Sequence, residues 1–503
     1  MTKPGRVRLV LILVVLLLAG GGLFLACGGG LDPDACEGGA CDAGVSPEGA
    51  SSTDASTPST DGSSPASDAS EASDAGRDAR PLPPCEDGGL PGALDPTFGD
   101  GGVVYIDLGA GVVSGADAVV LQPDGRTVLG GAVASSTSKL RFLLVRLTTT
   151  GGLDTSFGDG GIVDTPIPAG TGGGVHALTV TGDGTIVAGG LVLLTALSSD
   201  FAIARYSPGG VLDRTFGDGG IAFAGIGPPE SLRLASIAVL PDGSILAAGD
   251  AETLAPHSSD LVIAKLSPNG SLDTTFGASG KARIDIRPVD SGGAMVPQPD
   301  GKILVVGSSA PGGGPADPSA VRLNADGSFD PSFGAAGKVV LALPTPSAAD
   351  TVVLDGAGRI VLGGSTGKSL SGDFAVFRLT STGALDSTFG SGGVASADFG
   401  ANDRVMGGGL YIQADGKYLA AGQTYTSSPF TVRDAVARFL PDGAPDLGFG
   451  TGGRVVVPDR SDFYVVSSAV AFSGGRATFA GVWRPLWVAP PAPNWMGVSR
   501  HCL

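Results

Sequence analysis

Leu94-Asp95-Pro96-Thr97-Phe98-Gly99 is the stretch that decides how this chain folds. A closely similar stretch returns six more times, at intervals of 56 to 60 residues. Its phenylalanines are Phe98, Phe157, Phe216, Phe276, Phe333, Phe389 and Phe449. Self-similarity at a fixed period is typical of repeat architectures. The seven copies therefore predict one array of repeat units that takes up the chain from residue 93 to its end.

Each unit contains four short runs of apolar and β-branched residues, divided by turn residues. In the third unit the runs are 221–224, 235–240, 244–249 and 260–266. Such runs indicate β-strands. Asp-Gly between the second and third runs, here Asp242-Gly243, supplies the backbone conformation that a tight hairpin needs. No segment after the N-terminal apolar run shows a long helical period.

Four antiparallel strands per unit, repeated seven times, predict an all-β, seven-bladed β-propeller. The seventh unit is complete where the chain ends, as a closed ring requires, because closure leaves no sheet edge exposed between blades. An open β-solenoid is the alternative, although its repeats are usually much shorter. The predicted propeller spans 93–503, with blades at 94–152, 153–211, 212–271, 272–328, 329–384, 385–444 and 445–503.

Two runs carry a more specific resemblance. Asp373–Leu379, with Leu385–Gly390 after it, and Asp415-Gly416-Lys417 resemble the delta-60 repeat family. That family consists of β-propeller-like repeats of exported bacterial, often myxobacterial, proteins. The resemblance covers nearly everything after residue 93. It implies a propeller fold and brings no established activity, so no catalytic residue is carried over from it.

Residues 1–26 have the pattern of a lipoprotein signal peptide. Basic residues precede an uncharged apolar run, Leu9–Ala26. The run ends beside Cys27 in a sequence that resembles a lipobox, although Phe24 and Leu25 depart from the family pattern. We expect Cys27 to be lipidated; a transmembrane anchor is the alternative. Both place the remainder outside the cytoplasm, and Gly28 favours the outer membrane or cell surface of a Gram-negative bacterium.

Residues 27–92 are rich in Ser, Ala, Asp, Gly and Pro. A segment of this composition buries too little apolar surface to offset the entropy lost on ordering. Its excess of acidic residues makes it repel itself and extend. We therefore expect a disordered tether between the lipid and the folded part. A glycosylated stalk is the alternative.

Four cysteines remain if Cys27 carries lipid: Cys36, Cys41, Cys85 and Cys502. An even number of cysteines in an exported protein indicates disulfides. Cys36 and Cys41 lie close together and are expected to pair. Cys85 precedes the first repeat and Cys502 ends the last, so a bond between them would join the two ends of the ring. Metal ligation is the weaker interpretation, because no histidine or second CxxC lies nearby.

The charge balance limits the partners. The net charge is −18, which opposes binding to nucleic acid phosphates and anionic lipid headgroups. We expect no nucleic acid, membrane contact through the lipid anchor only, a monomer, and an unknown protein or glycan partner.

An aspartate and a basic residue recur once in every unit. This regularity predicts internal ion pairs between the fourth strand and the motif turn, rather than a ring of ligands. The aspartates are Asp95, Asp154, Asp213, Asp273, Asp330, Asp386 and Asp446. The basic residues are Arg146, Arg205, Lys265, Arg322, Arg378, Arg438 and Arg500.

No catalytic, cofactor-binding or metal-binding residue is predicted. His176, His257 and His501 fall at different places in their units, as ordinary polar residues do. The chain has no HExxH and no Asp-x-Asp-x-Asp-Gly calcium loop. Calcium on the variable loops stays an open alternative to an expectation of no cofactor.

Three tryptophans gather in the seventh unit: Trp483, Trp487 and Trp495. An exposed aromatic cluster would form a recognition patch. An equally good interpretation is that the three side chains cover the point where the ring closes.

The leading hypothesis is a non-enzymatic surface lipoprotein whose propeller is a binding or scaffold module. The alternative is an exported hydrolase or lyase with its site in the central funnel, since propellers host many functions. A third hypothesis is a spacer with no ligand. A centre lined by carboxylates, histidine or arginine from several blades would favour the enzyme, whereas small residues and backbone there would favour the scaffold.

Overall fold

The computed structural model describes residues 90–503, except for 110–111, 136–137, 169, 196–197, 227–229, 255–256, 313, 369–370, 428–429, 458–462 and 486–493. All described residues belong to one compact unit. The predicted signal peptide and residues 27–89 of the predicted tether, with Cys27, Cys36, Cys41 and Cys85, lie outside them, as does Trp487. Within the described part, no helix is long and apolar enough to cross a membrane.

The described residues form strands and no α-helix, as the short apolar runs predict. The first fourteen are β1 (Val103–Ile106), β2 (Val112–Leu121), β3 (Thr127–Ser135), β4 (Arg141–Leu147), β5 (Ile162–Thr165), β6 (Gly172–Val180), β7 (Ile186–Leu193), β8 (Ser199–Tyr206), β9 (Ile221–Phe223), β10 (Ser231–Val239), β11 (Ile245–Leu254), β12 (His257–Leu266), β13 (Lys281–Ile284) and β14 (Val289–Pro297). The others are β15 (Ile303–Ala310), β16 (Asp317–Leu323), β17 (Lys338–Val340), β18 (Ser347–Leu354), β19 (Ile360–Lys368), β20 (Ser371–Leu379), β21 (Val394–Ala397), β22 (Asn402–Ile412), β23 (Tyr418–Ser427), β24 (Phe430–Phe439), β25 (Arg454–Val456), β26 (Phe463–Ser473), β27 (Arg476–Pro485) and β28 (Trp495–Cys502).

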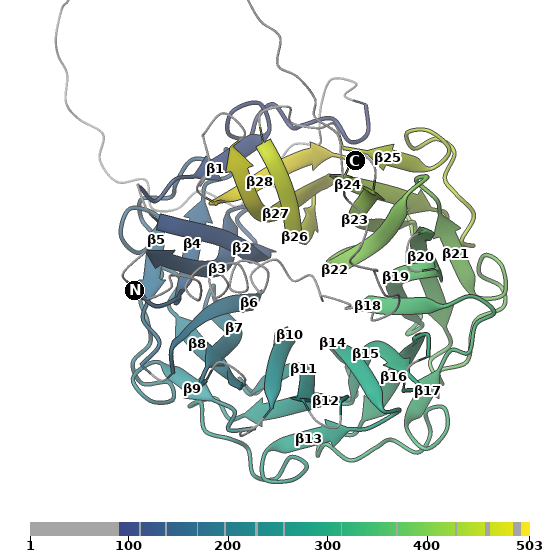
Figure 1. Cartoon of the computed structure of the whole chain (residues 1–503), viewed down its shortest axis with the longest axis horizontal. Coiled ribbons are helices and arrows are strands. Elements are labelled where there is room, and N and C mark those ends of the chain that lie inside the picture. Colours follow the sequence, from purple (N-terminus) through teal and green to yellow (C-terminus); the bar gives the residue numbers. More distant parts are fainter. Residues whose placement is uncertain are drawn as a thin grey trace, which may run out of the picture. The chain divides into compact units, whose positions relative to one another are not determined.

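The strands pair antiparallel in groups of four, for example β2 with β3, β3 with β4 and β4 with β5. One strand of each group lies innermost, and Figure 1 shows these inner strands around a common centre. Each inner strand contacts the next, and the last contacts the first. The inner strands are β2, β6, β10, β14, β18, β22 and β26.

The expected all-β class with four-stranded antiparallel groups is confirmed. Counted by hydrogen bonding, however, the described strands form six sheets rather than seven. Five sheets have four strands, and one has eight. The larger sheet arises because a single parallel bridge, between Ser259 of β12 and Val289 of β14, joins two groups.

The sheets are offset by one strand from the sequence units. The strand that follows each motif pairs with the strand before the motif, as β9 pairs with β8. The strand after the first motif, β1, therefore pairs with the last strand of the chain, β28. One sheet thus contains strands from both ends of the repeat array.

The motif is the turn that makes this backward pairing. In the third copy, the Asp213 N–H donates to the Arg205 carbonyl at 2.9 Å and the Phe216 N–H donates to the Asp213 carbonyl at 3.1 Å. The Arg205 guanidinium lies 4.7 Å from the centroid of the Phe216 ring, a cation–π contact. The motif phenylalanine is fully buried in all seven copies, which makes it a packing residue.

A bulge interrupts every inner strand. In β2 the register passes from Ala116 to Ala118, and in β6 it passes from Val175 to Ala177. A bulge leaves one residue unpaired and re-aims its side chain. Glycine in the neighbouring strand makes room for it: a Cβ on Gly190 of β7 would lie 1.9 Å from the Gly174 carbonyl oxygen.

Replacing Gly190 with alanine is expected to lower the free energy of unfolding by about 1–3 kcal/mol, the usual cost of overpacking. The added methyl group would overlap the Gly174 carbonyl oxygen. Gly182→Ala is the matched control, because a Cβ in that turn has nothing within 4 Å. Urea unfolding of both variants measures the effect, and equal midpoints would refute it.

Candidate active site at the centre of the ring

The bulges of four inner strands each hold a polar residue. The residue that the register skips is Asp117 in β2, His176 in β6, Asp350 in β18 and Ser468 in β26. All four strands are inner strands that surround the centre (Figure 1). The same irregularity therefore brings acidic, imidazole and hydroxyl groups together from segments far apart in the sequence.

Asp117 and His176 form the first pair of this site. His176 Nδ1 lies 3.6 Å from Asp117 Oδ2, and their side chains are 22% and 8% exposed. Burial raises the pKa of Asp117 to about 7, although the nearby Ser468 hydroxyl offsets part of the rise. Burial, with the positive charge of Arg233, lowers the pKa of His176 to about 4. At neutral pH the imidazole is therefore neutral and the carboxyl group is about half protonated.

Two arginine–aspartate pairs complete the cluster. Arg233 of β10 donates to Asp250 of β11 through Nη2 at 2.8 Å and Nε at 3.3 Å. Arg404 of β22 donates to Asp350 through Nε at 2.9 Å, and its Nη2 also contacts that carboxylate. Asp250 raises the pKa of Arg233, whereas the positive charge of Arg404 lowers it. These two guanidiniums therefore interact, although β14 and β18 lie between their strands in ring order.

The recurring ion pairs lie outside this cluster. The structure places every motif aspartate 2.7 to 3.0 Å from the basic residue of the preceding strand. The arginine also reaches the next unit: Arg322 Nη1 donates to the Ser381 carbonyl at 2.6 Å. The pairs are Asp95–Arg500, Asp154–Arg146, Asp213–Arg205, Asp273–Lys265, Asp330–Arg322, Asp386–Arg378 and Asp446–Arg438. Their role is to connect neighbouring units.

Asp434 of β24 gives a test of the internal electrostatics. Burial raises its pKa to about 6, although hydrogen bonds from Ser467 and Gln423 offset part of the rise. A carboxyl group whose pKa is higher in the folded than in the unfolded protein stabilises the folded state at pH values below the unfolded-state pKa. That stabilisation is lost as the pH rises through the folded-state pKa. Asp434 therefore costs stability at neutral pH.

Asp434→Asn is expected to gain stability relative to the wild type as the pH rises from about 4 to 7. The amide cannot ionise, so it avoids the cost of a buried charge. Asp446→Asn is the control: hydrogen bonding to Gly448 and the charge of Arg438 lower the Asp446 pKa against the effect of burial. Its difference from the wild type should stay constant over this pH range. Thermal unfolding at several pH values measures both, and a flat difference for Asp434→Asn would contradict the assignment.

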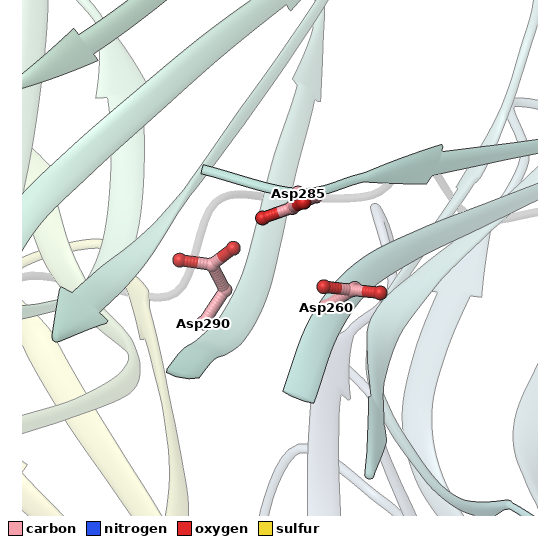
Figure 2. Close-up of side chains that lie close together, drawn as sticks. All are labelled: Asp260, Asp285 and Asp290. Carbon is pink, nitrogen blue, oxygen red and sulfur yellow. The ribbon is translucent and has the colours of Figure 1, made fainter. Parts of the chain in front are cut away.

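Two acidic triads occupy equivalent places in two repeat units. Figure 2 shows Asp260, Asp285 and Asp290 gathered from neighbouring strands. One carboxylate oxygen of each lies within 4.8 Å of the others. Asp260 is paired with Arg283, and the buried Asp290 accepts the Ile286 N–H at 2.7 Å. Protein groups therefore already satisfy part of this triad.

The second triad is Asp373, Asp398 and Asp403. Burial, together with the charges of Asp398 and Asp403, raises the pKa of Asp373. Three carboxylates fall short of the six to eight oxygen ligands that Ca²⁺ takes. We assign no ion to either triad.

The predicted tryptophan patch needs correction. Trp483 is 1% exposed and packs with Val103, so it cannot contribute to a surface patch. Trp495 stacks on Tyr105 with ring centroids 5.3 Å apart. Both lie in the sheet that holds β1 and β28, which agrees with the interpretation that they cover the junction of the two ends.

A hollow of about 480 Å³ opens between the turns at 122–126 and 182–184. Arg146 and Ser156 line it, and both hydrogen-bond to Asp154. Its other polar residues, Gln122, Asp124, Arg126 and Asp183, belong to the recurring hairpin turns. The centre, in contrast, holds polar groups that the repeat does not explain. The centre is therefore the better candidate site.

The fold defines the class, a repeat protein of the β-propeller type. Six stretches match the family model described as "Domain of unknown function (DUF5122) beta-propeller": 122–157, 181–216, 240–276, 298–333, 358–389 and 413–449. This agrees with the expected kind of repeat. No curated protein matches the chain.

Several solved structures are similar at low identity. The polysaccharide lyase Uly1 is 12% identical, with a TM-score of 0.43 over 77% of this chain and 90% of its own. A PQQ-bound aldose sugar dehydrogenase from Streptomyces coelicolor is 13% identical, with a TM-score of 0.33 over 79% and 98%. A thermostable family-43 glycoside hydrolase is 13% identical, with a TM-score of 0.31 over 64% and 96%. Likenesses this distant leave the chemistry to be argued from this chain's own residues.

Proposed function

We propose that this chain is a hydrolase or lyase whose site lies at the centre of the ring, at Asp117 and His176. The observation that carries this proposal is the convergence of carboxylate, imidazole and guanidinium groups from several inner strands. A scaffold would have small residues and backbone there. The alternative stated from the sequence is therefore better supported than the non-enzymatic binding module.

The pair offers both halves of proton-transfer chemistry. A neutral imidazole can accept a proton, and a carboxyl group with a pKa of about 7 can donate one at neutral pH. A general acid or base works best when its pKa lies near the working pH, which Asp117 meets, whereas a pKa of about 4 makes His176 a weak base at neutral pH. The arginines beside them can bind or stabilise negative charge on a substrate or product.

Variants of the pair test this function. His176→Ala and Asp117→Asn should each reduce turnover by about 10²–10⁴-fold. Asp183→Asn, in the turn after β6, is the control and should keep wild-type turnover. Reducing-end release detects cleavage by either kind of enzyme, and the ultraviolet absorbance of an unsaturated product identifies a lyase. Turnover that is unchanged in both pair variants would reject the assignment.

We propose further that the ring has seven blades, with the eight-stranded sheet counted as two. The support is that the two halves of that sheet share only one bridge and each has its own inner strand, β10 and β14. An experimental structure that shows a different number of inner strands around the centre would refute this count.

The export of the chain is also a proposal. The pattern of residues 1–26 and Cys27 supports a lipid-anchored protein at the outer membrane or cell surface, with the tether between lipid and ring. Mass spectrometry of the N-terminal peptide tests it. An acylated Cys27 agrees with the lipid anchor, whereas an uncleaved N-terminus would replace it with a transmembrane one.

A further inference from the structure

We infer that Arg233 and Arg404 form an anion-binding subsite that holds a carboxylate or sulfate group of the substrate. This inference rests on the proposed function, because it concerns the same centre as Asp117 and His176. It names the substrate class that the proposed function leaves open: a glycan that carries acidic groups.

An aspartate fixes the orientation of each guanidinium on one side, and the other side is available to a ligand. Arg233 and Arg404 use Nε and Nη2 for their aspartates. Within the described part of the chain, Nη1 of neither arginine makes a hydrogen bond. The aspartates are shielded, with Asp250 7% and Asp350 15% exposed, whereas both arginine side chains are 57% exposed. A ligand that enters the centre therefore meets the N–H donors and not the carboxylates.

The two arginines come from different parts of the ring and still interact. Arg404 is among the charges that lower the pKa of Arg233, and Asp350, the partner of Arg404, is among those that raise it. Both β10 and β22 border the centre (Figure 1). Two like charges within interaction range repel each other, and an anion between them would relieve that repulsion. Asp250 and Asp350 more than offset that repulsion, because the pKa of each arginine is raised overall, so both guanidiniums stay charged and available to an anion.

The chemistry of the donors selects the ligand. Guanidinium groups match the planar, two-oxygen geometry of carboxylates and the oxygens of sulfate or phosphate esters. The bound aspartates fix the plane of each guanidinium, so less freedom is lost on binding. The overall electrostatic field of the protein does not attract an anionic ligand, because the chain carries a net charge of −18. Polyanions should therefore bind only where donors are arranged for them.

Titration calorimetry of the mature protein with three polymers tests the inference. The probes are polygalacturonate, which carries carboxylates, dextran sulfate, which carries sulfate esters, and neutral dextran. We expect one charged polymer to bind and dextran not to bind. Whichever charged polymer binds identifies the group.

Variants locate the binding. Arg233→Gln and Arg404→Gln should each weaken it at least tenfold. Arg283→Gln is the matched control. Arg283 lies on the outer strand β13, is 44% exposed and is paired with Asp260 and Glu230. Its affinity should equal that of the wild type. The double variant Asp350→Asn/Arg404→Gln removes both partners of one pair and keeps the test valid if Arg404→Gln alone unfolds.

The outcomes separate this inference from the proposed function. Binding that needs the two arginines, with no cleavage of the bound polymer, keeps the subsite and rejects the enzyme. Cleavage of dextran that is unaffected by the arginine variants keeps the enzyme and rejects the subsite. Absence of binding to both charged polymers, or equal weakening by Arg283→Gln, would overturn the subsite.

Discussion

Asp95→Ala should lower the free energy of unfolding by about 3–5 kcal/mol, the cost of leaving a buried charge without its partner. Asp95 accepts hydrogen bonds from Arg476 Nε at 2.6 Å and Arg500 Nε at 2.8 Å. All three side chains are at most 4% exposed. The substitution would leave two buried guanidiniums facing each other in the sheet that joins the two ends of the repeat array.

The repeat supplies its own control. Asp213 occupies the same motif position, but it is 32% exposed and its partner Arg205 is 22% exposed. Exposed pairs of this kind contribute about 0–1 kcal/mol. Asp213→Ala should therefore cost far less than Asp95→Ala in urea unfolding. Equal costs would mean that burial does not set the strength of the motif ion pair.

Cys502→Ser is the second change with a large expected effect. If Cys85 and Cys502 are bonded, the bond closes a loop of about 400 residues, and its loss should cost on the order of 5 kcal/mol. The geometry favours the bond, because the Gly92 N–H donates to the Cys502 carbonyl at 2.7 Å and the Cys502 N–H donates to the Ala93 carbonyl at 2.9 Å. Gly92 and Ala93, a few residues after Cys85 in the sequence, thus lie beside Cys502.

Reduction should lower the melting temperature of the wild type but not that of Cys502→Ser. Cys36→Ser, in the tether, is the control and should melt as the wild type does. Peptide mapping without reductant should recover the two cysteines in one cross-linked peptide. Free thiols at both positions would leave the backbone hydrogen bonds and the Asp95 cluster as the links between the chain ends.

The sequence predicted the fold well because the fold depends on features that recur. The motif phenylalanine and the four apolar runs each recur seven times, and the Asp-Gly turn recurs in five of the seven units. The spacing of the motif aspartate and basic residue likewise matches a contact that every unit makes. The offset between units and sheets was missed, because periodicity cannot show where a unit's boundary falls.

The candidate site was missed because it depends on what does not recur. His176 was dismissed because no other unit has a histidine at that place, yet the inner-strand bulge holds Asp117, Asp350 or Ser468 there in other units. A useful signal was present: the residue before Ala118 and Ala177 varies in type while its neighbours stay small or apolar. Convergence of Arg233 and Arg404 could not be read from spacing, because their strands are brought together only by ring closure.

The pairing of β1 with β28 sets the order of events when this protein is made. β1 ends at Ile106 and its partner begins at Trp495, so β1 emerges early and finds its partner last. At about 5–20 residues per second, translation of the intervening segment takes roughly 20–80 s. Throughout that time β1 lacks its partner strand, and the sheet whose inner strand β26 borders the centre is incomplete. The activity that we propose should therefore arise only after the final strand has left the ribosome, and a nascent chain stalled before β28 should be prone to aggregate.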